Sequence, residues 1–415
     1  MSNQNRTIYG GKVNREKPIN FVFNGKSYIG YQGDTLASAL LANDVHLIGR
    51  SFKYHRARGI LTAGSEEPNA IVQLGLGART EPNIRATEVE LYEGLEASSQ
   101  NCWPSVNFDI GAMNNFLSRI FPAGFYYKTF KWPPSMWLFY EHFIRKAAGL
   151  GQSPTAKNPD RYEQKFYYTD ITIVGGGISG LLAALGAGRS GCKVLLIDEN
   201  PELGGYLLDY NFSINEKDGK KWLKKIIDEL NGLANVVILK RTTAMGYYDY
   251  NYLTALEKVT NHHVEFSSTL PRERYWRIRS KKVILAQGAF ERPLVFADND
   301  RPGIMMASAG QKYLSRYGVL PCKSVVLFTN NDHAYLTAFE FVEKGAKVTV
   351  VDTRDLLNAR ISEKCKSLNI TVFKSYSVIK TYGDKKVNRI EIQQVDKDQN
   401  KLTGEVENIH TDCVL

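Results

Sequence analysis

A glycine-rich turn at residues 175–180 constrains the fold of this chain more than any other feature. It reads GGGISG and lies between an apolar segment, DITIV, and a helix-like segment, LLAALGAGRSG. Glycines spaced in this way allow a tight turn, let the backbone approach a pyrophosphate and let the helix pack on the strand. The N-terminus of that helix presents free N–H groups to the phosphates. The pattern therefore predicts a dinucleotide-binding domain.

Two carboxylates end the next apolar segment, CKVLLI. Asp198 lies 18 residues after Gly180, close to the spacing of the acid that binds ribose hydroxyls in such domains, and Glu199 follows it. A carboxylate at this place accepts hydrogen bonds from ribose hydroxyls and repels a 2′-phosphate. This pair favours NAD or FAD over NADP, and the residues leave the choice between NAD and FAD open.

Further segments are expected to meet the same ligand. The glycine pair Gly204-Gly205 lets the backbone run close to it, and the end of the third strand places Met245 beside the adenine. The strand VILAQG ends at Gly288, where the chain crosses the cofactor. The candidate cofactor residues drawn from these patterns are Gly175, Gly177, Ser179, Gly180, Asp198, Glu199, Gly205, Met245 and Gly288.

The segments that follow alternate between strand and helix patterns, which indicates parallel, doubly wound sheets and an α/β fold. A second strand–helix–strand unit begins at residue 324, but its turn reads TNND and contains no glycine. A pyrophosphate there would meet bulky side chains and the charge of Asp332. We expect this second domain to bind no nucleotide, and Asp352 at the end of its second strand to have a structural role.

The N-terminal residues predict a β-grasp module. Residues 19–30 read as two strands around an Asn-Gly turn, residues 33–45 as a helix, and residues 70–75 and 86–94 as further strands. Folds of this type often hold a [2Fe–2S] cluster on cysteines spaced C-x4-C-x2-C with a distant fourth. Residues 1–101 contain no cysteine, so we expect a ferredoxin-like module without a cluster and no metal site.

The predicted order is an N-terminal β-grasp module followed by a fold with two dinucleotide-binding domains. The expected boundaries are 17–95 for the β-grasp module, 96–165 for an aromatic-rich connector with a short helix at 136–147, 166–320 for the FAD/NAD(P)-binding Rossmann-like domain, 321–408 for the degenerate second domain, and 409–415 for a returning strand of the first Rossmann-like domain. The chain stops within that apolar strand, which we interpret as the end of a fragment.

Charge and cysteine content narrow the classes of protein. The net charge of +10 permits an anionic partner, and RSFKYHRARG at 50–59 concentrates cations and rings. No nucleic-acid-binding motif surrounds that stretch, so we expect no nucleic acid; it either faces an anion or a partner subunit, or is a solvated loop. Five scattered cysteines and the lack of a signal peptide or an 18-residue apolar span indicate a cytoplasmic protein outside the membrane.

Several longer stretches together resemble the α subunit of heterotetrameric sarcosine oxidase, over about residues 17–415. They are GDTLASALLAND, GRSFKYHRARGI, SEEPNA, NCWPSVNFDIGAMNNFLSRIFPAGFYYKTFKWP and AQGAFERPLVFADNDRPGIM. The resemblance implies a flavoprotein complex that demethylates sarcosine to glycine and makes hydrogen peroxide, with the methyl carbon released as formaldehyde or passed to tetrahydrofolate. The implied partners are the β, γ and δ subunits, with FMN at the interface with β and tetrahydrofolate only in a C-terminal half that this chain lacks.

The resemblance also implies NAD in a structural role, and it adds Asn200 and Tyr206 to the cofactor residues. Members of the family often have Arg where this chain has Asn200, so a cation near the adenine ribose is lost. Two alternatives stay open, a self-contained FAD-dependent amine or opine oxidoreductase and a non-catalytic, nucleotide-stabilised scaffold subunit. Because no histidine, cysteine or serine lies in a catalytic pattern, no catalytic residue is assigned.

Overall fold

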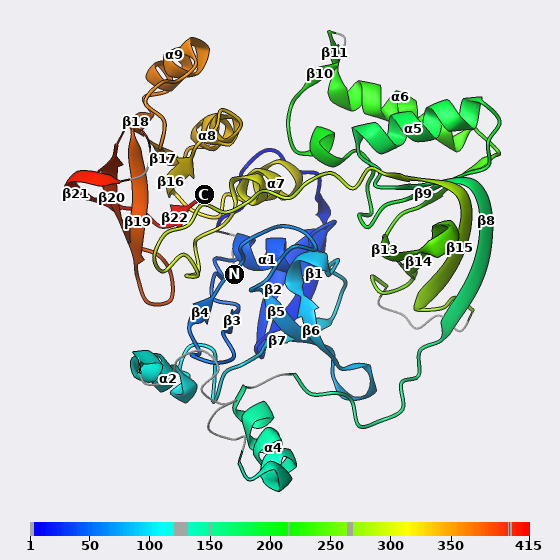
Figure 1. Ribbon diagram of the computed structural model, residues 1–415, viewed down its shortest axis with the longest axis horizontal. Helices are drawn as coiled ribbons and strands as arrows, with labels where there is room; N and C mark the ends of the chain where they lie inside the picture. Colours follow the sequence, from blue (N-terminus) through cyan, green and yellow to red (C-terminus); the bar gives the residue numbers. More distant parts are fainter. Residues whose placement is uncertain are drawn as a thin grey trace. The chain divides into compact units, whose positions relative to one another are not determined.

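The computed structural model describes residues 4–119, 132–148, 151–214, 216–263, 269–396, 398 and 401–415. Their contacts divide the chain into two compact units (Figure 1). The first combines residues 1–158 with 291–415, and the second comprises residues 159–290. Residues 291–320, which we expected in the first Rossmann-like domain, therefore lie in the same unit as the N-terminal module.

The N-terminal module is a five-stranded sheet with one helix, as predicted for a β-grasp fold. Its strand order is β2-β1-β7-β5-β6. The elements are β1 (Asn14–Phe23), β2 (Lys26–Gln32), α1 (Leu36–Ala42), β3 (Gly49–Arg50), β4 (Ala57–Arg58), β5 (Ile71–Leu74), η1 (Gly77–Arg79), β6 (Glu81–Arg85), η2 (Ala86–Glu88) and β7 (Leu95–Ser99). Asn24 and Gly25 both adopt positive φ in the hairpin turn, as an Asn-Gly turn requires, and Thr35 caps α1.

The prediction of a strand over residues 86–94 is wrong. Ala86–Glu88 forms the short helical turn η2, and the sheet instead uses β6 and β7 on either side. The backbone that follows η2 bonds to the start of α1, since the Leu36 N–H donates to the Val89 carbonyl at 2.8 Å. The apolar alternation of this segment thus reflects packing against a helix, which periodicity alone does not distinguish from a sheet.

The connector carries short helical segments. They are η3 (Ile110–Ala112), α2 (Met113–Phe116), η4 (Leu117–Arg119), η5 (Pro134–Met136) and α4 (Trp137–Ala148). The α4 helix covers residues 137–147 of the segment expected to be helical at 136–147, and Met136 belongs to η5. The stretch AGFYYKTF at 123–130 lies outside the described residues.

The remainder of the first unit contains a parallel sheet and a small antiparallel one. The elements are α7 (Ala307–Tyr317), β16 (Ser324–Thr329), α8 (Ala334–Glu343), β17 (Lys347–Asp352), α9 (Ala359–Ser367), β18 (Thr371–Lys374), β19 (Tyr376–Tyr382), β20 (Arg389–Val395), β21 (Leu402–His410) and β22 (Cys413–Val414). The parallel order is β18-β17-β16-β22, and β19-β20-β21 form the antiparallel sheet.

The last strand, β22, does not return to the first Rossmann-like domain as we expected for residues 409–415. It pairs in parallel with β16, with Cys413 opposite Val325 and Val414 opposite Val326. Cys413 and Val414 are both buried in that sheet. Pairing with β16 buries these side chains within the first unit, which the sequence of a single short strand does not reveal.

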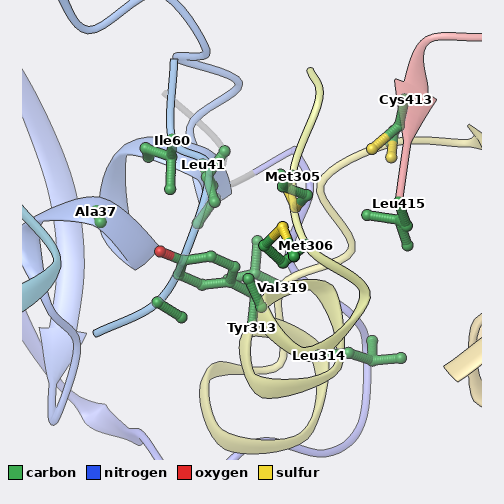
Figure 2. Packing of buried hydrophobic residues seen from close by; sticks show 14 of the residues in the cluster. Ala37, Leu41, Ile60, Met305, Met306, Tyr313, Leu314, Val319, Cys413 and Leu415 are labelled. Carbon is green, nitrogen blue, oxygen red and sulfur yellow. The ribbon is translucent and has the colours of Figure 1, made fainter. Parts of the chain in front are cut away.

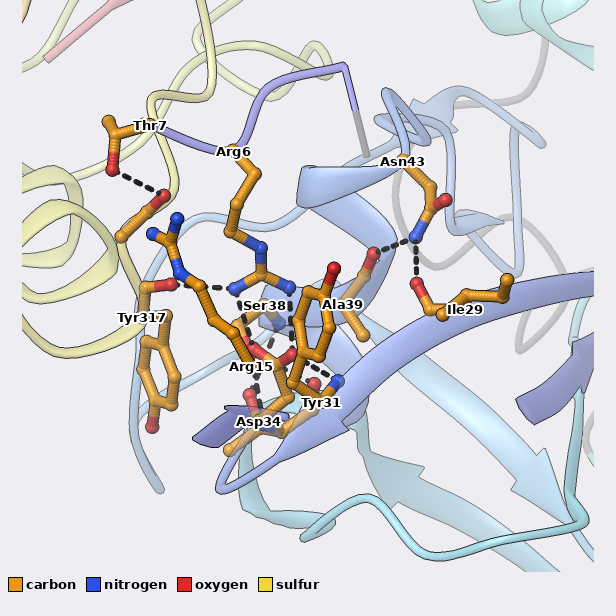
Figure 3. A network of polar contacts seen from close by, with 12 residues as sticks. Arg6, Thr7, Arg15, Ile29, Tyr31, Asp34, Ser38, Ala39, Asn43 and Tyr317 are labelled. Atoms are coloured by element: carbon orange, nitrogen blue, oxygen red, sulfur yellow. Dashed lines mark hydrogen bonds and ion pairs between the residues drawn. The ribbon is translucent and has the colours of Figure 1, made fainter. Parts of the chain in front are cut away.

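One hydrophobic core joins the N-terminal module to α7. Figure 2 shows the Tyr313 ring extending from α7 toward Ala37, Leu41 and Ile60, and all four residues belong to this core. A buried ion pair adds to the joint: Arg6 donates to the Asp34 carboxylate at 2.8 Å and to the Tyr317 carbonyl at 2.6 Å (Figure 3). Hydrophobic burial and this buried ion pair therefore hold α7 against the module.

The second unit is a six-stranded sheet of order β12-β9-β8-β15-β14-β13, with α5 and α6 packed together beside it (Figure 1). Its elements are β8 (Tyr162–Val174), α5 (Ile178–Arg189), β9 (Val194–Ile197), η6 (Gly205–Leu208), β10 (Ser213–Ile214), β11 (Lys217–Asp218), α6 (Gly219–Asn231), β12 (Val236–Leu239), β13 (Thr242–Tyr248), η7 (Asp249–Asn251), β14 (Tyr252–Lys258) and β15 (Glu273–Leu285). Strands β12, β9, β8 and β15 run parallel, which confirms the predicted α/β class.

Among the helices of the described ranges, none combines the length and apolar content needed to cross a bilayer.

Candidate functional site

The glycine turn joins β8 to α5 at the carboxyl end of the parallel strands, as predicted. Gly175 has a φ of +106°, and a Cβ there would clash with the Ala286 carbonyl oxygen just beyond β15. The Ala286 N–H donates to the Val174 carbonyl at 2.7 Å, which fixes the two chain segments side by side. Only glycine fits this position, because the turn needs both the positive φ and the close backbone approach.

The helix start leaves space on one side of the turn. Gly177 is the N-cap of α5, and a Cβ added there would meet no described atom within 4 Å. Ser179 is exposed in the first helical turn. Gly180 is buried, and a Cβ there would clash with the Gly175 carbonyl oxygen. The turn is thus closed on its strand side and open at the helix N-terminus, where an anion is stabilised.

Asp198 braces the glycine turn. Its Oδ2 accepts a hydrogen bond from the Gly176 N–H at 2.6 Å, and its Oδ1 accepts from the Asn200 backbone N–H at 2.8 Å and from Asn200 Nδ2 at 3.1 Å. A carboxylate offers about four acceptor sites, so it retains capacity for a ribose hydroxyl. Glu199 is exposed beside it.

Asn200 has a local role that its position in the sequence did not reveal. Besides binding Asp198, it accepts the Arg241 N–H on its carbonyl oxygen at 3.1 Å. The side-chain amide of Asn200 thereby helps to orient the carboxylate, and its backbone carbonyl connects the segments that follow β9 and β12.

The glycine pair Gly204-Gly205 contacts the glycine turn. The Gly204 N–H donates to the Gly176 carbonyl at 2.9 Å, and Gly205, with a φ of +52°, has room for a Cβ only 3.3 Å from Gly177 Cα. Tyr206 follows, with its ring half-exposed and stacked on Tyr210 at a centroid distance of 5.5 Å. Tyr210 was missed by the sequence reasoning, although its spacing of four residues from Tyr206 is a signal for such a pair.

Met245 and Gly288 lie on segments anchored beside the turn. The Thr242 N–H at the start of β13 donates to the Asp198 carbonyl at 2.9 Å, and Met245 follows in that strand with 61% of its surface exposed. Gly288 has a φ of +77° and lies two residues after Ala286. The predicted residues thus come from β8, α5, β9, η6, β13 and the segment after β15, all within the second unit.

This arrangement fits a dinucleotide. The open helix start would receive a pyrophosphate, Asp198 and Glu199 would receive the ribose hydroxyls, and the Tyr206 ring offers an exposed aromatic face. These contacts would be shared by NAD and FAD, because both contain the adenosine diphosphate half.

The corresponding turn of the second strand–helix–strand unit is filled by its own side chains. Asn331 Oδ1 accepts hydrogen bonds from the His333 N–H at 3.0 Å and the Ala334 N–H at 3.4 Å, at the start of α8. Asp332 forms an ion pair with Arg354 at 2.8 Å. A side-chain oxygen thus takes the helix N–H groups that a phosphate would otherwise use.

Asp352, at the end of β17, is fully buried and satisfied from within. It accepts a hydrogen bond from Tyr335 Oη at 2.8 Å and forms an ion pair with Arg354 at 2.8 Å. Burial and this hydrogen bond raise the pKa of Tyr335 far above its usual range, so the phenol remains a donor. These contacts account for Asp352 as a structural residue and leave it no ligand-binding task.

Several cations of the stretch at 50–59 contact other segments of the first unit, and a further contact with an anion or a partner subunit stays a prediction. Arg50 donates to the Val106 carbonyl at 2.8 Å, and His55 Nδ1 lies 2.7 Å from the buried Asp109 carboxylate. Arg56 pairs with two acids of the segment before α7, Asp298 at 2.7 Å and Asp300 at 2.6 Å. The stretch thus connects parts of the first unit, through acids and carbonyl groups that lie far away in the sequence.

Comparisons with known proteins cover both units. Residues 16–102 match a family described as a 2Fe-2S iron-sulfur cluster binding domain, and residues 170–247 match one described as FAD dependent oxidoreductase. Sarcosine oxidase subunit alpha of Rhizobium meliloti is 50% identical over 92% of this chain and 38% of its own length. Its counterpart in Corynebacterium sp. strain U-96 is 31% identical over 98% of this chain and 38% of its own length.

Among solved structures, L-proline dehydrogenase from P. horikoshii aligns with a TM-score of 0.59 and 18% identity, over 99% of this chain and 61% of that one. At this identity the likeness concerns the fold alone. It agrees with the predicted order of a ferredoxin-like module followed by a dinucleotide-binding fold.

The residues of the N-terminal module do not fit the cluster that its family description names. The matched range 16–102 contains a single cysteine, Cys102, at its last position. In the part of the chain that the structure describes, no three His, Cys, Asp or Glu side chains gather as a metal site. A [2Fe–2S] cluster needs four ligands, so this module cannot hold one.

Proposed function

The chain is a relative of the sarcosine oxidase α subunits, and from that premise we propose that it is the nucleotide-binding part of an amine-oxidising complex. It spans about a third of the length of the curated relatives that it matches, 32–38%. The observation that carries the proposal is the 50% identity to the Rhizobium meliloti subunit over 92% of the chain. The proposed reaction is oxidative demethylation of sarcosine to glycine, with hydrogen peroxide and either formaldehyde or methylene-tetrahydrofolate as products.

The proposed cofactor of the glycine turn is NAD in a structural role. The proposal is supported by the carboxylates at the ribose position, which disfavour NADP, and by the filled turn in the second strand–helix–strand unit. Within the residues that the structure describes, the second strand–helix–strand unit satisfies its own helix start, which supports a single nucleotide without a redox partner on this chain. The chain's own residues then bind and orient the nucleotide, and amine oxidation takes place on partner subunits.

The proposed partners are the β, γ and δ subunits, with FMN at the interface with β. FMN bound there would supply flavin redox chemistry at the interface, and this chain would contribute one side of its binding site. We propose that any tetrahydrofolate chemistry of the complex takes place outside the region that this chain matches.

The alternative function is a self-contained FAD-dependent amine or opine oxidoreductase. The match of residues 170–247 to an FAD-dependent family favours it. In that reading the glycine turn binds the diphosphate of FAD, and this chain itself carries the isoalloxazine ring. A second alternative is a non-catalytic scaffold subunit. In this case the bound nucleotide would only stabilise the assembly of the complex.

Co-purification tests the proposal. The chain is co-expressed with the flavin-bearing subunit of a sarcosine oxidase, and sarcosine-dependent oxygen uptake is measured together with size-exclusion elution. We expect a stable complex in which peroxide forms only when both proteins are present. Sarcosine or opine oxidation by the isolated chain with bound FAD would instead establish the alternative.

A further inference from the structure

In the N-terminal module, other residues occupy the positions that the cysteines of a cluster-binding loop would take. In plant-type proteins three ligands follow C-x4-C-x2-C, and the fourth is distant. The loop between β4 and β5 shows this spacing with Thr62, Glu67 and Ala70. All three are buried, with 5%, 1% and 0% of their surfaces exposed. A buried loop must satisfy its backbone polar groups from within the protein, because water does not reach them.

The Glu67 carboxylate is the point on which this loop converges. Its Oε2 accepts hydrogen bonds from the N–H groups of Leu61 at 2.9 Å and Thr62 at 2.6 Å, and from the Thr62 hydroxyl at 3.2 Å. Its Oε1 accepts from the N–H groups of Asn69 at 2.7 Å and Ala70 at 2.9 Å. Four backbone donors thus surround one anionic group inside the loop.

A distant residue closes the loop from another part of the module. Thr87 in η2 is buried, and its Oγ1 donates to the Gly64 carbonyl at 2.7 Å. Its neighbour Ala86 donates its N–H to the Ala70 carbonyl at 2.9 Å. Thr87 and Ala86 therefore hold a distant segment of the module against the loop.

We propose that this loop is a retained cluster cage, in which the Glu67 carboxylate replaces the iron–sulfur centre and Thr62, Ala70 and Thr87 stand at the other three cysteine positions. An iron–sulfur cluster is an anionic group whose sulfurs accept hydrogen bonds from the protein. The backbone donors of such a cage become buried and unsatisfied when the cluster is absent. A carboxylate from the loop itself satisfies them.

The cage then has a structural role, which is to hold the loop against α7, and it has no redox activity. Its carbonyl oxygens bind α7 and the residue before it: Tyr313 Oη donates to Thr62 at 2.8 Å, and Lys312 Nζ donates to Ala63 at 2.7 Å. The Met306 N–H donates to the Leu61 carbonyl at 2.8 Å. Glu67 thus fixes the loop from inside while α7 binds its outer side, and the module carries no electrons.

The first test compares two neighbouring charge removals, Glu67→Gln and Glu66→Gln. Glu66 is partly exposed, whereas in Glu67→Gln an amide NH2 would face the backbone N–H donors. We expect Glu67→Gln to lower the thermal unfolding midpoint by at least about 4 °C and Glu66→Gln to shift it by less than about 1 °C. Equal midpoints for the two variants would overturn the role of Glu67.

The second test rebuilds the ligands. The variant Thr62→Cys/Glu67→Cys/Ala70→Cys/Thr87→Cys is incubated anaerobically with iron and sulfide, beside a triple variant that retains Glu67. We expect about two irons per chain and a visible absorption band in the quadruple variant only. A quadruple variant with wild-type circular dichroism but no bound iron, or equal iron uptake by the triple variant, would contradict the cage. If the quadruple variant does not fold, the Glu67→Gln comparison decides.

Discussion

At the scale of single residues, Asp198 has a double task. It binds the Gly176 N–H and both donors of Asn200, and it retains acceptor capacity toward a ribose. The acid was predictable from its spacing after the glycine turn, because the fold requires a carboxylate at the end of that strand. Its bond to Gly176 was not predictable, since it depends on how the turn folds back over β9.

The Asp198→Ala variant should lose bound nucleotide. Removing a charged acceptor costs about 1.5–3 kcal/mol, or roughly ten- to a hundredfold in affinity, and the Gly176 N–H also loses its partner. The measurement is nucleotide released per chain on denaturation, with Asp228→Ala on the exposed face of α6 as the control. Unchanged nucleotide content in Asp198→Ala would refute the assignment of the ribose acid.

The ion pairs of Asp300 with Arg56 and Arg58 make the stability of the first unit depend on pH. Burial alone would raise the pKa of its carboxyl, but the ion pairs with Arg58 and Arg56 outweigh burial and hold this pKa below its usual value. As the pH falls, the unfolded chain therefore takes up this proton first. The stabilisation by Asp300 is complete above the unfolded pKa and is lost as the pH falls through the lower, folded pKa.

We therefore expect Asp300→Asn to reduce the loss of unfolding free energy as the pH falls through the usual titration range of aspartate and below it, compared with the unsubstituted chain. Urea unfolding across this range measures it. The matched control is Asp384→Asn, at an exposed position of the same unit. The same acid dependence in all three proteins would mean that the ion pairs with Arg56 and Arg58 do not contribute.

At the scale of elements, the packing of α5 against β8 requires that position 180 has no side chain. Gly180→Ala would place a methyl group against the Gly175 carbonyl oxygen and push α5 away from β8. Overpacking of this kind costs about 1–3 kcal/mol, and it would also displace the N–H groups that face a pyrophosphate. We expect a lower unfolding midpoint together with weaker nucleotide binding.

Gly186→Ala in the same helix is the matched control. Gly186 is exposed, and an added Cβ meets no described atom within 4 Å, so alanine should stabilise α5 by up to about 1 kcal/mol through helix propensity. Equal effects of the two substitutions on nucleotide binding would contradict the role given to the turn.

The elements that the sequence predicted well are those with a local cause. The hairpin at Asn24-Gly25, the capped helix α1 and the turn at Gly175 follow from backbone conformation and spacing within a few residues. The errors have distant causes. The segment 86–94 packs on α1, and β22 pairs with β16, through contacts that no local pattern records.

At the scale of the whole molecule, one nucleotide site per chain is expected. The second strand–helix–strand unit satisfies its own helix start with Asn331 and its strand-end acid with Tyr335 and Arg354. Equilibrium titration of nucleotide-free protein with NAD should therefore give one site per chain. A second site of similar affinity would contradict the closure of this unit.

The most direct test of the central claim is the absorption spectrum of the purified chain, followed by identification of the nucleotide that it releases on denaturation. We predict a protein without flavin absorbance that releases one NAD per chain. A yellow protein that releases one FAD per chain would contradict the proposal and establish a flavoenzyme in its place.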